Sequence, residues 1–270
     1  MLKGKKLAVI GVGKLGEALI TGLLKEGNLQ AQDISGSVCH EASLERVKNK
    51  LSIAVTLDNK KIASDADVIL LAVKPQNMDS VLGQIKDVID SKKLVISVAA
   101  SVSTAYVEQR LNQSVAVVRA MPNTPCVMNA GMTGICSGTH SSAEQMALAK
   151  EIFDCVGKTV LIDESLMDGL TALSASGPAY LYVVIESLAE AGVKLGISRE
   201  TSTLLAAQTM YGAARMVLES NAHPALLKDM VTTPAGCTID GLMELEEGKL
   251  RVTLIKAVVK AAQRARELIS

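Results

Sequence analysis

The sequence predicts an α/β protein made of a doubly wound parallel sheet followed by an all-helical domain. Three observations support this. An apolar run at residues 7–10 ends in a glycine-rich turn, residues 11–16, and opens directly into a helical pattern. Strand and helix patterns then alternate as far as Arg119, which is typical of parallel sheets. Beyond residue 163 no strand pattern remains, so we expect two domains, residues 1–163 and 164–270.

The glycine-rich turn reads Gly11-Val-Gly-Lys-Leu-Gly16 and has the spacing of a dinucleotide-binding motif. In that motif the first glycine makes the tight turn, the second lets a pyrophosphate approach the backbone, and the third lets helix and strand pack closely. N–H groups at the helix start then face the phosphates. The strand before and the helix after the turn are the context that the motif requires. The pattern favours a Rossmann-like domain over an ordinary glycine-rich turn, which remains the alternative.

The remaining elements of the first domain follow in order. Strands are expected at residues 33–37, 53–55, 67–73, 93–98 and 115–119, and helices at 41–49, 78–89 and 103–111. Ser103 is the expected N-cap of the last of these helices. Residues 120–126 form a stiff loop with two prolines. Residues 131–137 and 159–162 are expected to add edge strands around a helix at 142–155, in an antiparallel arrangement.

The second domain is expected to contain only helices. They are predicted at residues 178–195, 198–220, from Pro224 onward, at 238–246 and at 249–268. Many of them are apolar on more than one face, as at residues 180–185 and 204–207. Because a small monomeric domain cannot bury so much apolar surface, we expect dimerisation through these helices.

Composition excludes several classes of function. The chain has 270 residues, 49% of them hydrophobic, a formal net charge of +0 and only 2% aromatic residues without tryptophan. This argues against nucleic-acid binding and against a membrane-seeking patch. The five cysteines contain no CxxC pair, and the three histidines are far apart, so neither a disulfide framework nor a metal site is expected. The N-terminal apolar run is too short for a signal peptide, which predicts a cytoplasmic protein.

The end of the second strand bears on cofactor choice. An NAD-preferring domain usually carries an acid there, whereas this chain has Gly36-Ser37-Val38, and Asp33 precedes the strand. We therefore favour NADPH over NADH, with Ser37 near the 2′-phosphate, although Ser37 as a solvated loop serine is an equal alternative. The switch in strand order places residues 72–75 and 98–100 beside the nicotinamide. Lys74 is equally well interpreted as a catalytic cation or as a surface residue.

Two stretches of the helical domain have the features of a carboxylate site. Residues 173–180 and 232–238 each place hydroxyl groups and free N–H groups at a helix N-terminus. Simple N-capping explains either stretch alone.

The chain also lacks a His/Asp pairing and a lysine one turn into the helix that starts at Pro178. A C–OH oxidation needs a general base, whereas reduction of a protonated C=N bond needs mainly positioning and a proton source. We therefore expect imine reduction.

These residues together resemble the pyrroline-5-carboxylate reductase family over essentially the whole chain. The most specific match is residues 227–242, with Val231-Thr-Thr-Pro-Ala-Gly-Cys-Thr238 at its centre; residues 173–180, Ala72-Val-Lys-Pro75 and Asn123-Thr-Pro125 follow the expected order. The resemblance implies NAD(P)H-dependent reduction of 1-pyrroline-5-carboxylate to L-proline, the last step of proline biosynthesis. It also implies dimers through interlocked helical domains, often assembled into a decamer.

The resemblance and the glycine motif together give the expected site residues. Those expected to bind the dinucleotide are Ile10, Gly11, Val12, Gly13, Lys14, Leu15, Gly16, Ser37, Val38, Asn59, Ala72, Val73, Lys74, Pro75, Val98, Ala99 and Ala100. Those expected to bind the substrate are Glu164, Ser176, Gly236, Cys237 and Thr238. The Gly236 and Cys237 amides would hold the carboxylate, and the Thr238 hydroxyl would donate or relay a proton to the ring nitrogen.

Some alternatives stay open. Thr238 would instead cap its helix if water is the acid. A β-hydroxyacid dehydrogenase-like oxidoreductase and a non-catalytic NADPH-binding sensor are the rival functions. The chain also departs from the family pattern: Ala235 and Ser101 stand where glycine is common, and Met230 replaces an asparagine seen in some members.

Overall fold

The computed structural model describes residues 1–111 and 114–267. Its internal contacts divide the chain into two compact units, Met1–Ser176 with Ala261–Ser270, and Gly177–Lys260. Each unit is described by itself below. By contacts, residues 164–176 group with the first unit, and the domain boundary predicted at residues 163/164 stays a prediction.

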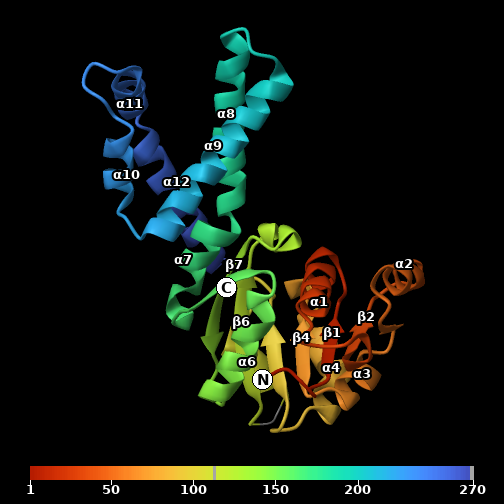
Figure 1. Ribbon diagram of the computed structural model, residues 1–270. Helices are drawn as coiled ribbons and strands as arrows, with labels where there is room; N and C mark the ends of the chain where they lie inside the picture. The colour runs from red at the N-terminus through yellow and green to blue at the C-terminus, as the bar shows by residue number, and fades with distance from the viewer. Residues whose placement is uncertain (112–113, 268–270) are drawn as a thin grey trace. The chain divides into compact units, whose positions relative to one another are not determined.

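The first unit is built on an 8-stranded sheet of order β3-β2-β1-β4-β5-β6-β7-β8 (Figure 1). Its strands are β1 (Leu7–Ile10), β2 (Ile34–Ser37), β3 (Ala54–Thr56), β4 (Val68–Leu71), β5 (Leu94–Ser97), β6 (Ala116–Pro122), β7 (Gly131–Ser137) and β8 (Gly157–Leu161). The first six strands are parallel, which confirms the predicted doubly wound sheet. β7 pairs antiparallel with β6, as expected of an added edge strand, but β8 pairs parallel with β7.

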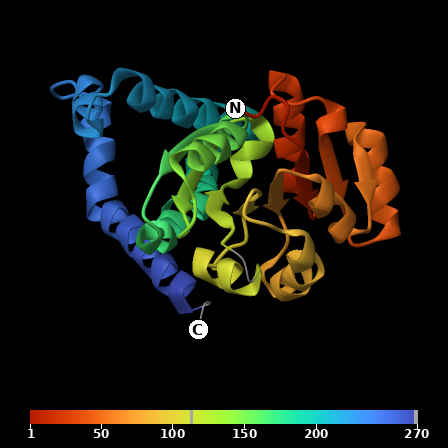
Figure 2. The ribbon, with the colours of Figure 1, turned by 90° about the horizontal axis from the view of Figure 1, so that it is seen from below.

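Helices cover both faces of this sheet. They are α1 (Lys14–Glu26), α2 (Glu41–Leu51), α3 (Asn59–Asp65), α4 (Met78–Ile85), α5 (Thr104–Leu111), α6 (Ala143–Asp154) and the short α7 (Met167–Leu170). In Figure 2 the red to orange α1–α4 region lies at one end of the sheet and the green β7 and β8 at the other. The Ser103 hydroxyl accepts the Tyr106 N–H at 3.1 Å, so Ser103 is the expected cap. The sequence pattern does not predict α3, because this helix is short and largely polar.

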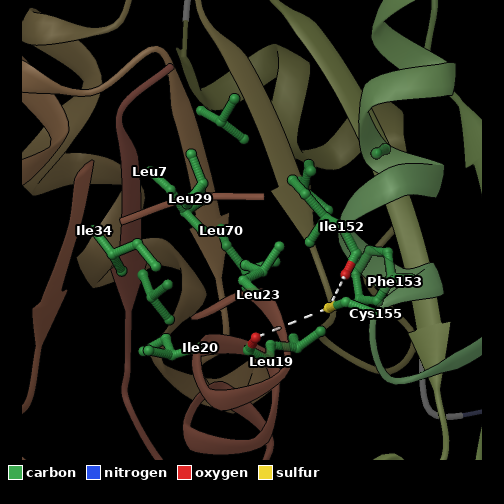
Figure 3. Packing of buried hydrophobic residues seen from close by; sticks show 14 of the residues in the cluster. Leu7, Leu19, Ile20, Leu23, Leu29, Ile34, Leu70, Ile152, Phe153 and Cys155 are labelled. Atoms are coloured by element: carbon green, nitrogen blue, oxygen red, sulfur yellow. Dashed lines mark hydrogen bonds between the residues drawn. The ribbon is translucent and has the colours of Figure 1, made fainter. Parts of the chain in front are cut away.

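Alternation along each strand separates the core into two layers. On one face, Leu7 and Leu70 pack with Leu23 of α1 and with Ile152 and Phe153 of α6 (Figure 3). The other face carries a second buried cluster, contributed mainly by α3, α4 and α5. Apolar burial on both faces stabilises the sheet and explains why the central strands β1 and β4 are continuous apolar runs.

One predicted loop is partly a strand. Residues 120–126 were expected to form a loop, but β6 extends through Ala120 and Met121 to Pro122, which lies opposite Thr133. The antiparallel partner β7 explains the difference, because it extends the ladder beyond the last parallel rung. Pro122 is tolerated because it is the final residue of the strand. The loop then continues as the 3₁₀ turn Thr124–Met128.

The second unit is helical, as predicted, and in the described residues no strand follows β8. The helices are α8 (Gly177–Lys194), α9 (Arg199–Ser220), α10 (Pro224–Met230), α11 (Cys237–Glu247) and α12 (Leu250–Glu267), whose residues from Ala261 onward belong to the first unit. The predicted end of α12 at Leu268 lies outside the described residues. α8 and α9 pack closely (Figure 1), because Gly192 faces Ser202, where an added Cβ would lie 2.5 Å from the Ser202 Oγ.

Large apolar side chains are exposed on these helices. On α8 and α9, Tyr182 is 61% exposed and Leu204 is 67% exposed, and Leu181, Leu205 and Met216 are exposed as well. An apolar surface of this extent is typical of a protein–protein interface. In the described part of the chain, no helix is long and apolar enough to cross a membrane.

Candidate active site

The register of the sheet aligns the ends of the strands that were expected to bind the dinucleotide. Ile10 is paired with both Ser37 and Leu71, and Leu71 is paired with Ser97. The residues that follow these positions therefore emerge at one edge of the sheet, the carboxyl edge. Strand order reverses between β1 and β4, which is the switch point where doubly wound sheets bind ligands.

The glycine turn after β1 shows why each glycine is needed. Gly11 has φ of 92°, and a Cβ there would lie 2.7 Å from Val73 Cγ1 and 2.9 Å from the Ala72 carbonyl oxygen. Gly16 lets α1 pack closely on β1, because a Cβ added at Gly16 would lie 3.3 Å from Val9 Cγ1. Gly13 differs, because no protein atom lies within 4 Å of its Cβ position. The space beside Gly13 is therefore open to a ligand.

The start of α1 offers donors in this open space. Gly13 is the N-cap of α1, and no side chain caps the helix. The first N–H groups of a helix have no intrahelical partner, so those of Lys14, Leu15 and Gly16 are available to an anion. Lys14 is exposed and Val12 is buried against the sheet, while the N–H groups of Gly11 and Val12 both donate to the Ser37 carbonyl.

Ser37 and Asn59 lie together, although 22 positions separate them. The Ser37 hydroxyl donates to Asn59 Oδ1 at 2.5 Å, and Asn59 Nδ2 donates to Gln84 Oε1 at 2.7 Å. Ser37 is only 1% exposed. Its hydroxyl proton is therefore already engaged in the hydrogen bond to Asn59. Val38 is buried as well, and the exposed residues that follow it are Cys39 and His40, which is the N-cap of α2. Sequence reasoning did not select these two, although they directly follow the second strand.

The other two segments also reach the carboxyl edge. The Ala72 N–H donates to the Ile10 carbonyl at 2.8 Å, and the Val98 N–H donates to the Leu71 carbonyl at 3.1 Å. Each bond lengthens the sheet by one residue and fixes the start of residues 72–75 and 98–100. Ala99 is buried, whereas Lys74 and Pro75 are exposed. Lys74 has no ion pair within the described residues, so its two interpretations both remain.

Glu164 lies in a network inside the first unit. Its carboxylate accepts the Thr104 N–H at 2.8 Å and the Thr104 hydroxyl at 2.6 Å, and it lies 3.4 Å from Arg119 Nη1. Arg119 is 3% exposed, and its Nη2 lies 3.9 Å from Asp168. Both Glu164 oxygens are thus already hydrogen-bonded, and this geometry favours a role in fixing β6 against α5. Direct contact with substrate stays a prediction.

The predicted substrate loop between α10 and α11 is only partly free to bind an anion. Gly236 is the N-cap of α11, and its N–H donates to the Thr233 carbonyl at 3.0 Å. The expected carboxylate contact from the Gly236 amide therefore competes with this turn. The N–H groups of Cys237, Thr238 and Ile239 form the open first turn of α11.

Thr238 itself does not cap α11. It lies at the second helical position, Gly236 is the cap, and no hydrogen bond from the Thr238 hydroxyl occurs within the described residues. The alternative in which Thr238 serves mainly as a helix cap is therefore wrong. Its half-exposed hydroxyl is available to a ligand.

Two departures from the family pattern lie in the left-handed backbone region. Ser101 has φ of 62° and Ala235 has φ of 56°. Glycine adopts this region without penalty, which fits the expectation from the family resemblance that glycine is common at both positions. Ser101 has a compensating contact, because its hydroxyl donates to the Ala265 carbonyl at 3.4 Å. Ala235 is exposed, and its methyl group cannot form a compensating hydrogen bond.

We expect Ala235→Gly to relieve this strain. A non-glycine residue in the left-handed region costs roughly 1–2 kcal/mol, partly offset by the greater freedom of glycine in the unfolded chain. The melting temperature should stay the same or rise, as measured by thermal denaturation. Gly→Ala at Gly83, an exposed site of α4 with no atom within 4 Å of its Cβ position, is the control that measures ordinary Gly/Ala exchange. A clear fall in melting temperature for Ala235→Gly would contradict the prediction.

Comparison with known proteins supports a single family. A family model for pyrroline-5-carboxylate reductase dimerisation matches residues 164–268, and a model for NADP oxidoreductase, coenzyme F420-dependent, matches residues 6–101. The pyrroline-5-carboxylate reductase of Methanosarcina acetivorans is 43% identical over 267 residues, which is 99% of each chain.

Solved structures support the same family assignment. That of a pyrroline-5-carboxylate reductase from Coxiella burnetii has a TM-score of 0.94 and 37% identity, and covers 98% of this chain and 99% of that one. That of the Plasmodium falciparum pyrroline carboxylate reductase with NADP bound has a TM-score of 0.88 and 33% identity, and covers 99% of each chain. The chain therefore belongs to the pyrroline-5-carboxylate reductase family.

Proposed function

We propose that this protein reduces the C=N bond of 1-pyrroline-5-carboxylate to give L-proline, the last step of proline biosynthesis. NADPH, when bound, supplies a hydride to C5 of the ring, and the ring nitrogen takes up a proton. The observation that carries this proposal is the open first turn of α11, where the free Thr238 hydroxyl stands among unpaired N–H groups. A small anionic imine needs such a site, and it needs no catalytic base.

The first unit fits a dinucleotide. A Cβ on Gly11 would clash with the Ala72 backbone, so the tight turn requires glycine there. The space beside Gly13 is open and lies next to the free N–H groups of α1. We assign the pyrophosphate to Gly13–Gly16, and the nicotinamide half to Ala72–Pro75 and Val98–Ala100. We assign the adenosine ribose to the end of β2, where Cys39 and His40 are exposed. No acidic residue lies between the end of β2 and Glu41, so no carboxylate there would repel a 2′-phosphate. This arrangement favours NADPH.

The second unit fits the imino acid. We assign the substrate carboxylate to the N–H groups of Cys237 and Thr238, because the Gly236 amide is used by the turn. The Thr238 hydroxyl donates to the ring nitrogen and relays the proton from water. Ser176, the last residue of the first unit before α8, is assigned to the imino acid on the family resemblance alone.

Self-association is part of this function. A dimerisation model covers the helical region, and apolar side chains are exposed on α8 and α9. We propose a dimer formed through these helices that assembles further into a decamer, which sedimentation would test. We also propose the cytoplasm as its location, since all five cysteines are free thiols.

A steady-state assay tests the function. The purified protein should form proline from 1-pyrroline-5-carboxylate, with a higher kcat/KM for NADPH than for NADH. Equal or better efficiency with NADH would overturn the cofactor preference. Oxidation of a β-hydroxy acid without proline formation would favour the dehydrogenase alternative, and cofactor binding without any turnover would favour the sensor.

Thiol labelling tests where each ligand binds. Burial raises the pKa of the Cys136 and Cys155 thiols to about 12 and also raises the pKa of the Cys126 thiol, so these three should react slowly. Cys39 and Cys237 are exposed, and one lies at each assigned site.

We expect iodoacetamide to modify Cys39 and Cys237 in the free protein. NADPH should slow the labelling of Cys39 selectively, and proline should slow that of Cys237, as followed by peptide mass spectrometry. The three buried cysteines are the internal control. Protection of neither exposed thiol by its ligand would contradict the assigned sites.

A further inference from the structure

Asn123 connects three parts of the first unit through one side chain. It directly follows β6, and its Oδ1 accepts the Met132 N–H of β7 at 2.9 Å. Its Nδ2 donates to the Ser174 carbonyl at 3.2 Å, 51 positions away. The amide orientation follows from its partners, because a backbone N–H requires an acceptor and a carbonyl requires a donor. Asn123 therefore extends the β6–β7 ladder and binds the segment before α8.

That segment has an unusual backbone. Residues 171–175 form a π-helical turn, closed by a bond from the Ser176 N–H to the Thr171 carbonyl at 2.9 Å. π-turns are rare and frequently lie at functional sites. The Ser174 hydroxyl is buried and finds no hydrogen-bond partner in the described residues. The bond from Asn123 to the Ser174 carbonyl is thus a side-chain anchor for a turn that is otherwise incompletely hydrogen-bonded.

The position of the turn links Asn123 to the substrate. Ser174 lies two residues before Ser176, which is assigned to the imino acid. A shift of the Ser174 carbonyl would move the Ser176 hydroxyl with it, because both belong to one continuous helical segment. Asn123 itself is half-buried. Its effect on the substrate would therefore pass through the turn.

We propose that Asn123 is a positioning residue for the imino acid: it holds the π-helical turn so that Ser176 meets the substrate. This inference rests on the proposed function. The role requires both halves of the amide. The acceptor half fixes Asn123 to β7, and the donor half fixes the turn to Asn123, so loss of the donor alone releases the turn without opening the sheet.

The test is Asn123→Asp, which keeps the acceptor for Met132 but places a carboxylate oxygen against the Ser174 carbonyl. At pH 8 the KM for 1-pyrroline-5-carboxylate should rise on the order of 10-fold, as expected for loss of a hydrogen bond that positions the turn, while the KM for NADPH changes less than about 2-fold. The Ser174 carbonyl oxygen disfavours the charged carboxylate and so raises the pKa of the new carboxyl group, which takes up a proton and donates again as the pH is lowered. The increase in KM relative to the unsubstituted protein should therefore shrink toward pH 5.

Asn129→Asp is the matched control, because Asn129 is exposed in the same loop and its side chain makes no hydrogen bond within the described residues. It should leave both KM values and their pH dependence unchanged. Asn123→Gln keeps an uncharged donor and acceptor and serves if Asn123→Asp does not fold; it should raise the KM for the imino acid several-fold.

The outcomes separate this inference from the proposed function. If the unsubstituted protein forms no proline, the proposed function fails and this inference fails with it. If the unsubstituted protein is active but Asn123→Asp behaves like Asn129→Asp, only the inference is overturned. A pH-independent rise in KM, or an equal rise in the KM for NADPH, also overturns it, because general loosening of the fold would produce either result.

Discussion

Gly13→Asp is expected to abolish most NADPH binding without destabilising the protein. Gly13 has φ of −102° and ψ of −162°, an extended conformation that aspartate adopts freely. Apart from its chain neighbours, no atom lies within 4 Å of its Cβ position, so a side chain can begin there without a clash. Aspartate is also among the best N-cap residues, so α1 should gain a few tenths of a kcal/mol over its present glycine cap. The melting temperature should not fall.

The effect on the cofactor should have the opposite sign. The carboxylate would occupy the space assigned to the pyrophosphate and repel it. Two like charges about 4 Å apart near a protein surface repel by roughly 4 kcal/mol. The Kd for NADPH, measured by fluorescence titration, should therefore rise on the order of 100-fold or more. A stabilised helix combined with lost binding would locate the pyrophosphate at this turn.

Two further variants make this experiment specific. Gly83→Asp places the same charge on α4 at an open site away from the glycine turn, and should leave NADPH binding unchanged. Gly11→Ala should lower both stability and binding, because its Cβ would lie 2.9 Å from the Ala72 carbonyl oxygen. If Gly13→Asp bound NADPH as well as Gly83→Asp does, the pyrophosphate assignment would be wrong.

Thr238→Ala is expected to give the largest loss of turnover. Removal of a positioned proton donor typically costs at least about 100-fold in rate, so kcat should fall by about that factor. The Kd for NADPH should stay nearly unchanged, since Thr238 belongs to the second unit and the dinucleotide is assigned to the first. Thr238→Ser keeps the hydroxyl and should retain most of the activity.

Stability distinguishes this from a structural effect. Because Gly236 caps α11, loss of the Thr238 hydroxyl removes no capping bond, and the melting temperature should be unchanged. Thr253→Ala is the control for threonine truncation in a helix start, because Thr253 is exposed in the first turn of α12 and its hydroxyl makes no hydrogen bond within the described residues. An unchanged kcat for Thr238→Ala would contradict the proposed role of its hydroxyl in proton transfer and would indicate that water is the proton donor.

Much of the fold could be predicted because its signals are local. The strand at residues 131–137 was predicted with the bounds that β7 has, and the glycine turn lies where its spacing indicated. Ser103, Ser142 and Ser198 each stand at the start of a predicted helix and cap it. Buried strands and capped helices depend on residues within a few positions of each other, and the printed sequence displays those directly.

Other features depend on residues far apart and were missed. β6 extends past its predicted end only because β7 pairs with it. α3 is short, so its apolar period is too brief to recognise. The strained backbone at Ala235 follows from the course of the loop, which residue types alone do not show.

The sequence by itself determined the doubly wound fold, the glycine turn that receives a dinucleotide, and the resemblance that pointed to imine reduction. Only the tertiary structure decided which polar groups remain available for ligands. Ser37 is bound to Asn59, the Gly236 amide is used by a turn, and the Thr238 hydroxyl is free. Periodicity records which face of an element is buried, but a hydrogen-bond partner is chosen by the folded backbone, often tens of residues away.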